Sequence, residues 1–296
     1  AVQEQYVSEN STFCQGSPML GADVCLEGFG EQQQQSYTKE QENHMLREAV
    51  QAAEEADIVV LAIGEDRLQS GEATSNANIR IPEVQEALLD RIAEVNQNIV
   101  VVLFSGRPLD IREINKKAKA ILQVWLPGTE GARAIADTLF GKYNPSGKLP
   151  MSFPYCVGQV PVHYNEYLDI PNEPLYPFGY GLSYTTFEVS DIHLDRTWMD
   201  TSGQIEAEVT VKNTGNCTGT ETLQLYIHDI AASVVRPVRE LKDFKKVTLR
   251  PGEEKKVVFT ITEQQLLFLT ENGIYESEAG EFEIFIGKDS STDNKA

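Results

Sequence analysis

The pattern of apolar and polar positions changes near residue 141 and divides the chain into two parts. In the first part, short apolar runs alternate with stretches whose apolar residues recur every three or four positions. The runs indicate strands buried on both faces of a parallel sheet, and the stretches indicate helices. The runs are 58–63, 99–104 and 120–125, and the helical stretches are 37–56, 82–95, 109–118 and 130–140. This alternation predicts an α/β sandwich with a mainly parallel sheet.

The second part of the chain predicts a different architecture. Prolines and glycines crowd the stretch from 142 to 184, which indicates an irregular crossing between two domains. Beyond Tyr184 the apolar period becomes two, which is the period of strands with one buried face. The alternating segments are 205–212, 222–227, 255–261 and 282–286. They predict an antiparallel β-sandwich of about a hundred residues.

These patterns divide the chain into five segments. We expect a weakly structured lead-in over 1–37, an α/β/α sandwich domain over 38–155 and an irregular linker over 156–187. The β-sandwich follows over 188–288, and 289–296 is expected to be a disordered tail. Because only about forty residues precede the first clear helix, the sandwich is expected to lack its first strand–helix units. An exposed sheet edge would favour association, so a homodimer is one candidate assembly.

The charge balance argues against one class of partner. The chain carries 45 acidic and 25 basic residues and a formal net charge of −20. Such a balance repels phosphates, so we expect no nucleic-acid partner and interpret the charge as a source of solubility. No window approaches about 18 consecutive apolar residues, so we expect no membrane span. The opening residues lack the basic and apolar regions of a signal peptide, and the compartment stays open between cytoplasm, periplasm and exterior.

The cysteine and histidine positions argue against a metal site. The four cysteines are too scattered for zinc, which takes closely paired ligands, and the four histidines show no metal spacing. We therefore expect no metal and no cofactor. Cys14 and Cys25 are close enough in sequence for a local disulfide, and two free thiols are an equal alternative.

The leading candidate for catalysis is Glu72, in the polar loop Ser70-Gly-Glu-Ala-Thr-Ser75. This loop leaves the carboxyl end of the first predicted strand, the edge at which open α/β sheets usually bind ligands. The alternative is a solvated surface glutamate. Glu65 and Asp66 open the same loop, and Arg107 follows the second strand. Each of the three is a candidate for substrate binding. The alternative for Glu65 and Asp66 is a structural salt bridge, and the alternative for Arg107 is a contact with a neighbouring domain.

Three ordered motifs rich in proline and glycine carry more specific information. They are Trp125-Leu-Pro-Gly-Thr-Glu-Gly131, Leu139-Phe-Gly-Lys-Tyr-Asn-Pro-Ser-Gly-Lys-Leu-Pro-Met-Ser-Phe-Pro154 and Leu175-Tyr-Pro-Phe-Gly-Tyr-Gly-Leu-Ser-Tyr-Thr-Thr-Phe187. Together they resemble the C-terminal region of glycoside hydrolase family 3, the β-glucosidase family. Val211-Lys-Asn-Thr-Gly215 and the segment 236–244 are similar to its fibronectin type III-like domain. The resemblance covers about 40–288 and is closest to bacterial periplasmic-type β-glucosidases.

The resemblance implies hydrolysis of terminal β-D-glucosides with retention of configuration, which needs two carboxyl groups about 5–5.5 Å apart. In the family the nucleophile is an aspartate of an N-terminal (β/α)8 barrel, within a Ser-Asp-Trp-like motif that this chain lacks. The general acid/base is the glutamate of a Glu-Ala-Ser-Ser-Arg-like motif. Glu72-Ala-Thr-Ser-Asn76 matches that motif in place and type, except that Asn76 stands where the arginine would be. Arg67 and Arg80 are candidates to replace the missing cation.

The resemblance thus implies a C-terminal fragment that supplies the acid/base Glu72 and lacks the barrel with its nucleophile. The implied partners are a β-glucoside or oligosaccharide substrate and the missing barrel domain of the same protein. We expect Glu72 to be solvated and the fragment alone to be inactive. Two alternatives stay open, namely a non-catalytic module that binds sugar or a partner protein, and the same region of a β-xylosidase.

Overall fold

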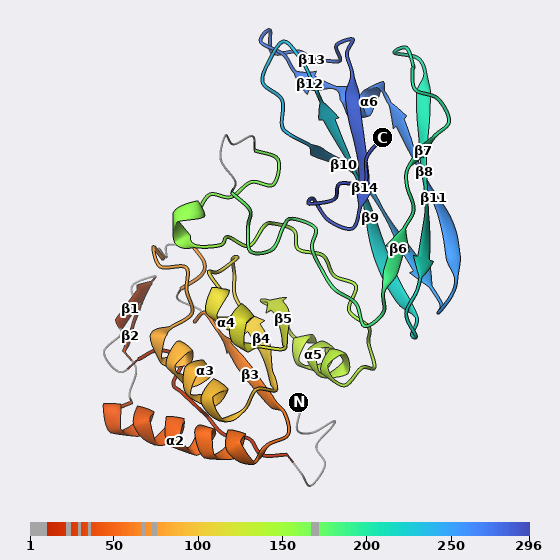
Figure 1. Ribbon diagram of the computed structural model, residues 1–296. Helices are drawn as coiled ribbons and strands as arrows, with labels where there is room; N and C mark the ends of the chain where they lie inside the picture. The colour runs from red at the N-terminus through yellow and green to blue at the C-terminus, as the bar shows by residue number, and fades with distance from the viewer. Residues whose placement is uncertain are drawn as a thin grey trace. The chain divides into compact units, whose positions relative to one another are not determined.

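The computed structural model describes residues 11–21, 25–28, 31–34, 37–66, 69–72, 76–166 and 172–296. The chain forms two compact units (Figure 1). One unit holds the described residues up to Lys142 together with Phe153–Val160, and it contains a parallel sheet with helices. The other holds Tyr143–Ser152 and the described part of Pro161–Ala296, and its strands are antiparallel. The two predicted fold classes, α/β followed by a β-sandwich, are therefore confirmed.

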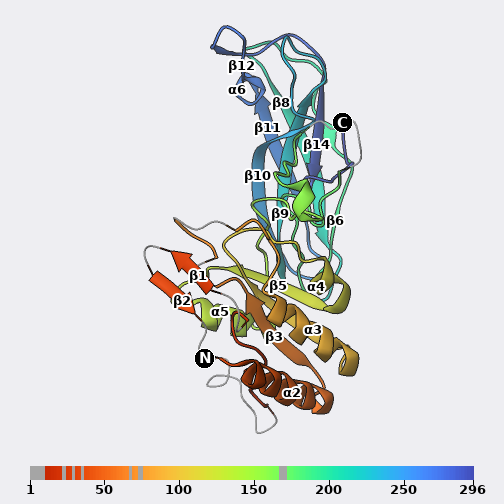
Figure 2. The ribbon, with the colours of Figure 1, turned by 90° about the vertical axis from the view of Figure 1, so that its left-hand side faces the viewer.

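The α/β unit is centred on three parallel strands in the order β3-β4-β5, which are β3 (Val59–Gly64), β4 (Ile99–Phe104) and β5 (Ala120–Trp125). Gly64 pairs with Phe104, so β3 and β4 end level at the carboxyl edge of the sheet. The helices are α2 (Lys39–Glu55), α3 (Glu83–Val95), α4 (Arg112–Lys117) and α5 (Gly131–Leu139). Helices α2 and α3 lie side by side (Figures 1 and 2).

Alternate positions of β3 and β4 supply the core of this unit. Leu61 and Ile63 in β3 are 7% and 5% exposed, and Val101 and Leu103 in β4 are fully buried. Helix α3 packs against β3 and buries Leu88, Leu89 and Ile92. Burial of apolar surface, at about 25 cal/mol per Å², is what holds this helix layer on the sheet.

Strand β3 was expected to be buried on both faces, and this expectation is wrong. Val60 is 51% exposed and Ala62 is also exposed, whereas Leu61 and Ile63 are buried. Successive side chains of a strand point to opposite faces of the sheet, so one face of β3 is open to solvent at these positions. Among the described strands β3 pairs only with β4. The central strand β4 comes closer to the expected pattern, with four of its six residues buried.

Helix α4 begins at Arg112, three residues later than the sequence predicts. The N–H of Asp110 donates to the carbonyl oxygen of Ile79 at 2.8 Å, so residue 110 is bonded to a neighbouring segment instead of a helical turn. The first helix begins at Lys39, two residues later than the predicted stretch. Thr38 and Gln41 form a reciprocal capping box at the start of α2, which satisfies two N–H groups at the helix end.

The described lead-in residues are more closely packed than the sequence predicts. Leu20 is 1% exposed, and the backbone at Gly16 passes so near Leu88 and Ala49 that a Cβ there would be crowded. The chain at Gly16 thus packs on α2 and α3. Farther along, β1 (Cys25–Gly28) and β2 (Glu31–Gln34) form an antiparallel pair. Along the chain, the short 3-10 helix η1 (Val157–Gln159) follows α5.

The second unit is a β-sandwich of two antiparallel sheets. Their strand orders are β10-β9-β14 and β11-β8-β6, with β7 also paired to β8. The strands are β6 (Phe187–Val189), β7 (His193–Leu194), β8 (Gln204–Asn213), β9 (Gly219–Asp229), β10 (Glu240–Leu249), β11 (Glu254–Thr262) and β14 (Phe282–Gly287). Side chains of both sheets, among them Val209, Leu225 and Phe259, form one core. A short helix α6 (Glu263–Leu266) and the pair β12 (Phe268–Leu269) and β13 (Tyr275–Glu276) complete the unit.

The C-terminal segment 289–296 was expected to be a disordered tail, and this expectation is wrong. The backbone N–H and carbonyl groups of Ala296 each bond to Ile284 at 2.9 Å. The backbone of Lys295 forms an antiparallel β-bridge with Phe285, and its side-chain Nζ forms an ion pair with Glu283 Oε1 at 2.6 Å. The segment therefore pairs along β14. Its polar composition conceals this pairing because the bonds are made by the backbone.

Candidate functional site

The connection that carries Glu72 leaves β3 at the carboxyl edge of the parallel sheet. It begins after Gly64 and ends where α3 starts at Glu83, and within it the structure describes 65–66, 69–72 and 76–82. Glu72 is exposed, as expected from the sequence. Its carboxyl group thus faces solvent at the edge where α/β sheets place their ligand chemistry.

Glu65 and Arg107, two candidates for substrate binding, contact each other. Arg107 Nε lies 3.2 Å from Glu65 Oε1, and the Glu65 side chain is 1% exposed. The other oxygen, Oε2, accepts a hydrogen bond from the N–H of Gly106 at 3.1 Å. A buried carboxylate persists because a cation and hydrogen-bond donors replace its lost hydration. The ion pair joins the connection that follows β3 to the one that follows β4.

The same pair is bonded to the Glu72 connection on both sides of Glu72. The Arg107 guanidinium donates from Nη2 to the carbonyl oxygen of Gln69. Asn76 Nδ2 donates to Glu65 Oε1 at 3.4 Å. Asn76, at the position of the motif arginine, thus faces a buried carboxylate. We refer to Glu65, Gln69, Asn76, Gly106 and Arg107 together as the loop anchor.

Asp66 is buried and forms a turn with Gln69. Its N–H donates to Gln69 Oε1 at 2.8 Å, and the Gln69 N–H donates to the Asp66 carbonyl at 3.0 Å. The structure therefore brings Glu65, Asp66 and Arg107 together at the base of the connection that carries Glu72. Their role in substrate binding stays a prediction.

Two residues that shape this edge have no strong signal in the sequence. Gln85 of α3 is 3% exposed, and its amide bonds both the N–H and the carbonyl of Gly64 at 2.7 and 3.0 Å. At Gly106, a Cβ would overlap the side chain of Ser70. The only available signals were a polar residue on an apolar helix face and a glycine after a strand. Neither identifies its tertiary partner.

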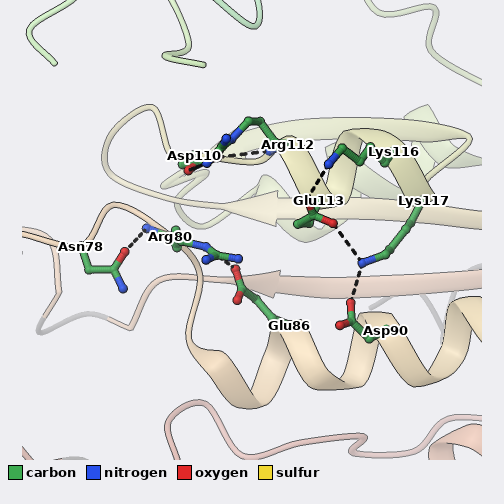
Figure 3. Close-up of polar contacts among 9 residues, drawn as sticks. All are labelled: Asn78, Arg80, Glu86, Asp90, Asp110, Arg112, Glu113, Lys116 and Lys117. Atoms are coloured by element: carbon green, nitrogen blue, oxygen red, sulfur yellow. Dashed lines mark hydrogen bonds and ion pairs between the residues drawn. The ribbon is translucent and has the colours of Figure 1, made fainter. Parts of the chain in front are cut away.

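A network of ion pairs lies between α3, α4 and the stretch 76–82 (Figure 3). Arg80 Nε lies 2.8 Å from Glu86 Oε1, so this candidate replacement for the motif arginine pairs with α3. The other candidate, Arg67, lies outside the described residues. Lys117 of α4 pairs with Asp90 of α3 at 2.6 Å, which links the two helices. The stretch 76–82 is thus paired with α3 through Arg80, and α3 is paired in turn with α4.

Two carboxyl groups of this network have pKa values that shift in opposite directions. Burial opposes ionisation of Asp110, but hydrogen bonds from Arg112 outweigh it and hold the pKa below its ordinary value. Asp110 lies in the stretch predicted to be helical, but it precedes α4 and its side chain is 5% exposed. For Glu86 burial prevails over its Arg80 partner and raises the pKa.

Metal ligands, free thiols and long apolar helices would each indicate another kind of site. They contain no group of three or more His, Cys, Asp or Glu side chains that could hold a metal ion. Cys14, Cys156 and Cys217 are free thiols, and burial together with the nearby Glu48 raises the pKa of Cys14. Among the helices that the structure describes, none is long and apolar enough to cross a bilayer.

Comparison with known proteins identifies the family. Residues 4–184 match the glycosyl hydrolase family 3 C-terminal domain, and residues 221–290 match the fibronectin type III-like domain. The chain belongs to glycoside hydrolase family 3. The resemblance inferred from the motifs is thereby confirmed for both units of this family 3 chain.

Relatives within family 3 cover most of this chain. The chain is 47% identical over 265 residues to a periplasmic β-glucosidase of Salmonella typhimurium, which covers 83% of the chain and 35% of that protein. A putative β-xylosidase of Formosa agariphila is 40% identical over 270 residues, or 86% of the chain and 36% of that protein. A β-glucosidase of Listeria innocua, solved in complex with glucose, has a TM-score of 0.79 at 40% identity, covering 86% of the chain and 38% of that structure. The chain thus spans little more than a third of these relatives.

Proposed function

We propose that this chain is the C-terminal part of a retaining β-glucosidase and that Glu72 is its general acid/base. The observation that carries the proposal is the exposed Glu72 carboxyl, at the carboxyl edge of the sheet, in a family 3 chain. Supporting it, the relatives include β-glucosidases of which this chain spans little more than a third. The nucleophile would then lie in the barrel domain that the chain lacks.

The proposed reaction divides the work between two carboxyl groups. In the first step the Glu72 carboxyl gives its proton to the glycosidic oxygen, while the nucleophile attacks the anomeric carbon and the aglycone leaves. In the second step the Glu72 carboxylate takes a proton from water, which attacks the glycosyl intermediate and releases the sugar and the nucleophile. An acid catalyst must hold its proton near neutral pH, which requires burial or a nearby carboxylate. Exposed Glu72 would acquire that environment only with the barrel in place.

The first prediction concerns catalysis. The 296-residue chain alone should not hydrolyse an aryl β-glucoside, because only one of the two required carboxyl groups is present. A chimera in which this chain replaces the matched part of the Salmonella relative should be active, and Glu72→Gln in it should lower kcat by about 10²–10⁴-fold for a glucoside with a poor leaving group. The measurement is the steady-state kinetics of purified protein. A parallel assay uses an activated aryl glucoside, whose aglycone leaves without protonation, with azide added as a nucleophile that needs no general base.

The matched control is Glu83→Gln, at an exposed glutamate in the first turn of α3. It should leave kcat unchanged. Rescue of Glu72→Gln by azide, with a glycosyl azide as product, would support the acid/base role. Turnover by the chain alone, or full activity of Glu72→Gln, would contradict the proposal.

Two alternatives predict different results in the same material. If the protein is a β-xylosidase, the chimera should turn over aryl β-xylosides faster than aryl β-glucosides. The similarity to the Formosa relative is the reason to test this alternative. A sugar-binding module would bind glucose or cellobiose without any barrel. Isothermal titration calorimetry of the chain alone should therefore show no heat of binding if the chain holds half of an active site.

A further inference from the structure

The loop anchor touches the Glu72 connection at two points that lie on opposite sides of Glu72. Gln69 precedes Glu72 and accepts from the Arg107 guanidinium, and Asn76 follows Glu72 and donates to Glu65. We propose that Glu65 and Arg107 are positioning residues whose ion pair holds both ends of this connection and so fixes where Glu72 is presented. The inference rests on the proposed function, because it takes Glu72 to be the acid/base.

Burial makes the ion pair suitable for this role. A surface pair contributes little and exchanges partners with water, whereas the Glu65 side chain is 1% exposed and that of Arg107 is 29% exposed. Glu65 is also fixed at its own base, since its N–H donates to the Phe104 carbonyl at 2.9 Å. Its backbone is thus held by β4, and its carboxylate cannot turn to solvent without leaving the Gly106 N–H unpaired.

The shape of the guanidinium explains why arginine is needed at position 107. Its planar fork spreads the charge over several N–H groups, so Arg107 donates from Nη2 to the Gln69 carbonyl while its Nε lies within ion-pair distance of Glu65, at 3.2 Å. A lysine ammonium at the same place would keep the charge but act as a single point. The Arg107→Lys substitution therefore keeps the positive charge beside buried Glu65 but removes the contact with Gln69 that holds the connection.

Gly106 completes the loop anchor from the side of β4. Its N–H bonds Glu65 Oε2, and its missing side chain leaves room for Ser70, two residues before Glu72. A methyl group at this position would overlap Ser70 Oγ and Cβ. Gly106→Ala therefore displaces the connection by volume alone, without altering any charge.

The test is hydrogen–deuterium exchange of the 296-residue chain, read at the amides of Gln69–Glu72. The Gln69 amide, which donates to the Asp66 carbonyl, is the main reporter. Arg107→Lys and Gly106→Ala should each raise its exchange rate by about tenfold or more, while peptides of β8 exchange as in the parent. The thermal midpoint of Arg107→Lys should stay within about 3 °C of the parent.

Two matched controls accompany these variants. Arg91→Lys alters an exposed arginine that pairs with Glu94 on α3, and Gly158→Ala adds a methyl group whose nearest neighbour is Cys156 Sγ at 3.8 Å. Neither should change exchange at the Gln69 amide. Unchanged exchange in folded Gly106→Ala and Arg107→Lys would overturn the proposal. If Arg107→Lys does not fold, Gly106→Ala decides alone.

Kinetics of the chimera distinguish failure of this inference from failure of the proposed function. With Glu72 as acid/base, Arg107→Lys should lower kcat by about 10–10²-fold with KM little changed, because small misplacement of a catalytic group reduces the chemical step. If Glu72→Gln stays active, the proposed function fails, whatever the exchange data show. If Glu72→Gln is inactive but Arg107→Lys keeps full kcat, only the positioning role fails.

Discussion

Asp110 bonds two different segments of the chain, one through its side chain and one through its backbone. Arg112 donates to the two carboxylate oxygens from Nε at 2.9 Å and from Nη2 at 2.8 Å, while the Asp110 N–H donates to the Ile79 carbonyl. A two-point contact of this kind is stronger and more directional than a single hydrogen bond. Despite burial, these bonds lower the pKa of Asp110, so that the ionised form is favoured in the folded chain.

Asp110→Asn should therefore destabilise the α/β unit at neutral pH by about 1–3 kcal/mol, since Arg112 loses a charged acceptor. The contribution of a carboxyl group with a lowered folded-state pKa is fully present above its unfolded value near 3.9 and is lost as pH falls through the folded value. The difference between variant and parent should thus be constant from pH 7 to pH 5 and shrink below about pH 4. Urea unfolding at several pH values measures it.

The tryptophan content makes that measurement specific to one unit. The chain has two tryptophans, and Trp198 is 73% exposed. Its replacement by phenylalanine leaves Trp125, at the end of β5, as the single tryptophan reporter of the α/β unit. A difference that stays the same down to pH 3 would show that ionised Asp110 adds nothing beyond a neutral hydrogen bond.

At the scale of elements, Gln85 connects α3 to the end of β3. The Gly64 N–H donates to Gln85 Oε1, and Gln85 Nε2 donates to the Gly64 carbonyl and to that of Met19. One helix side chain thus takes the place of a neighbouring strand for the last residue of β3. It also ties the described lead-in to the same point.

Gln85→Leu should destabilise the α/β unit by about 2–4 kcal/mol, because it leaves buried backbone N–H and carbonyl groups without partners. The Trp198→Phe background and urea unfolding give the free energy. Gln97→Ala is the control, since Gln97 follows the end of α3 and its exposed amide donates to the Ala93 carbonyl at 3.0 Å. Equal effects of the two substitutions would contradict the role assigned to Gln85.

The sequence predicts the elements of the fold better than the contacts of the site, for a physical reason. The bounds of β4 and β5 follow from short apolar runs, and both were predicted to the residue. The loop anchor depends on Glu65 and Arg107, which are 42 positions apart and meet only because β3 and β4 are neighbours. Local patterns do not contain that information. The exposure of Val60 escaped prediction for the same reason, because it depends on what lies beside β3.

At the scale of the whole molecule, the chain presents an apolar edge. Ile58 and Val60 are 63% and 51% exposed, and among the described strands β3 has a partner on one side only. An open strand edge with exposed β-branched residues is a template for pairing with another chain. The homodimer considered from the sequence stays a prediction, and this edge is where we expect such contact.

If the isolated chain self-associates through β3, Val60→Lys should weaken the association by about tenfold or more, because a charge on an edge strand opposes pairing. Sedimentation velocity over a range of protein concentrations measures the effect. Val235→Lys is the control, since Val235 is 92% exposed in the β-sandwich unit. Association that responds equally to both substitutions would reflect net charge alone, and association that responds to neither would place the contact elsewhere.

The two glycines at the carboxyl edge affect how a mutational scan of this enzyme family should be interpreted. A side chain at Gly64 would collide with the Phe104 backbone, and one at Gly106 with Ser70. With Glu72 in its proposed role, a scan scored by catalytic rate would rank both positions with Glu72 as intolerant, although neither carries a functional group. Parallel scoring by abundance would separate them, with Gly64 variants lost as unfolded protein and Gly106 variants retained as folded protein of low activity. Libraries that diversify the Glu72 connection should therefore leave both glycines unchanged.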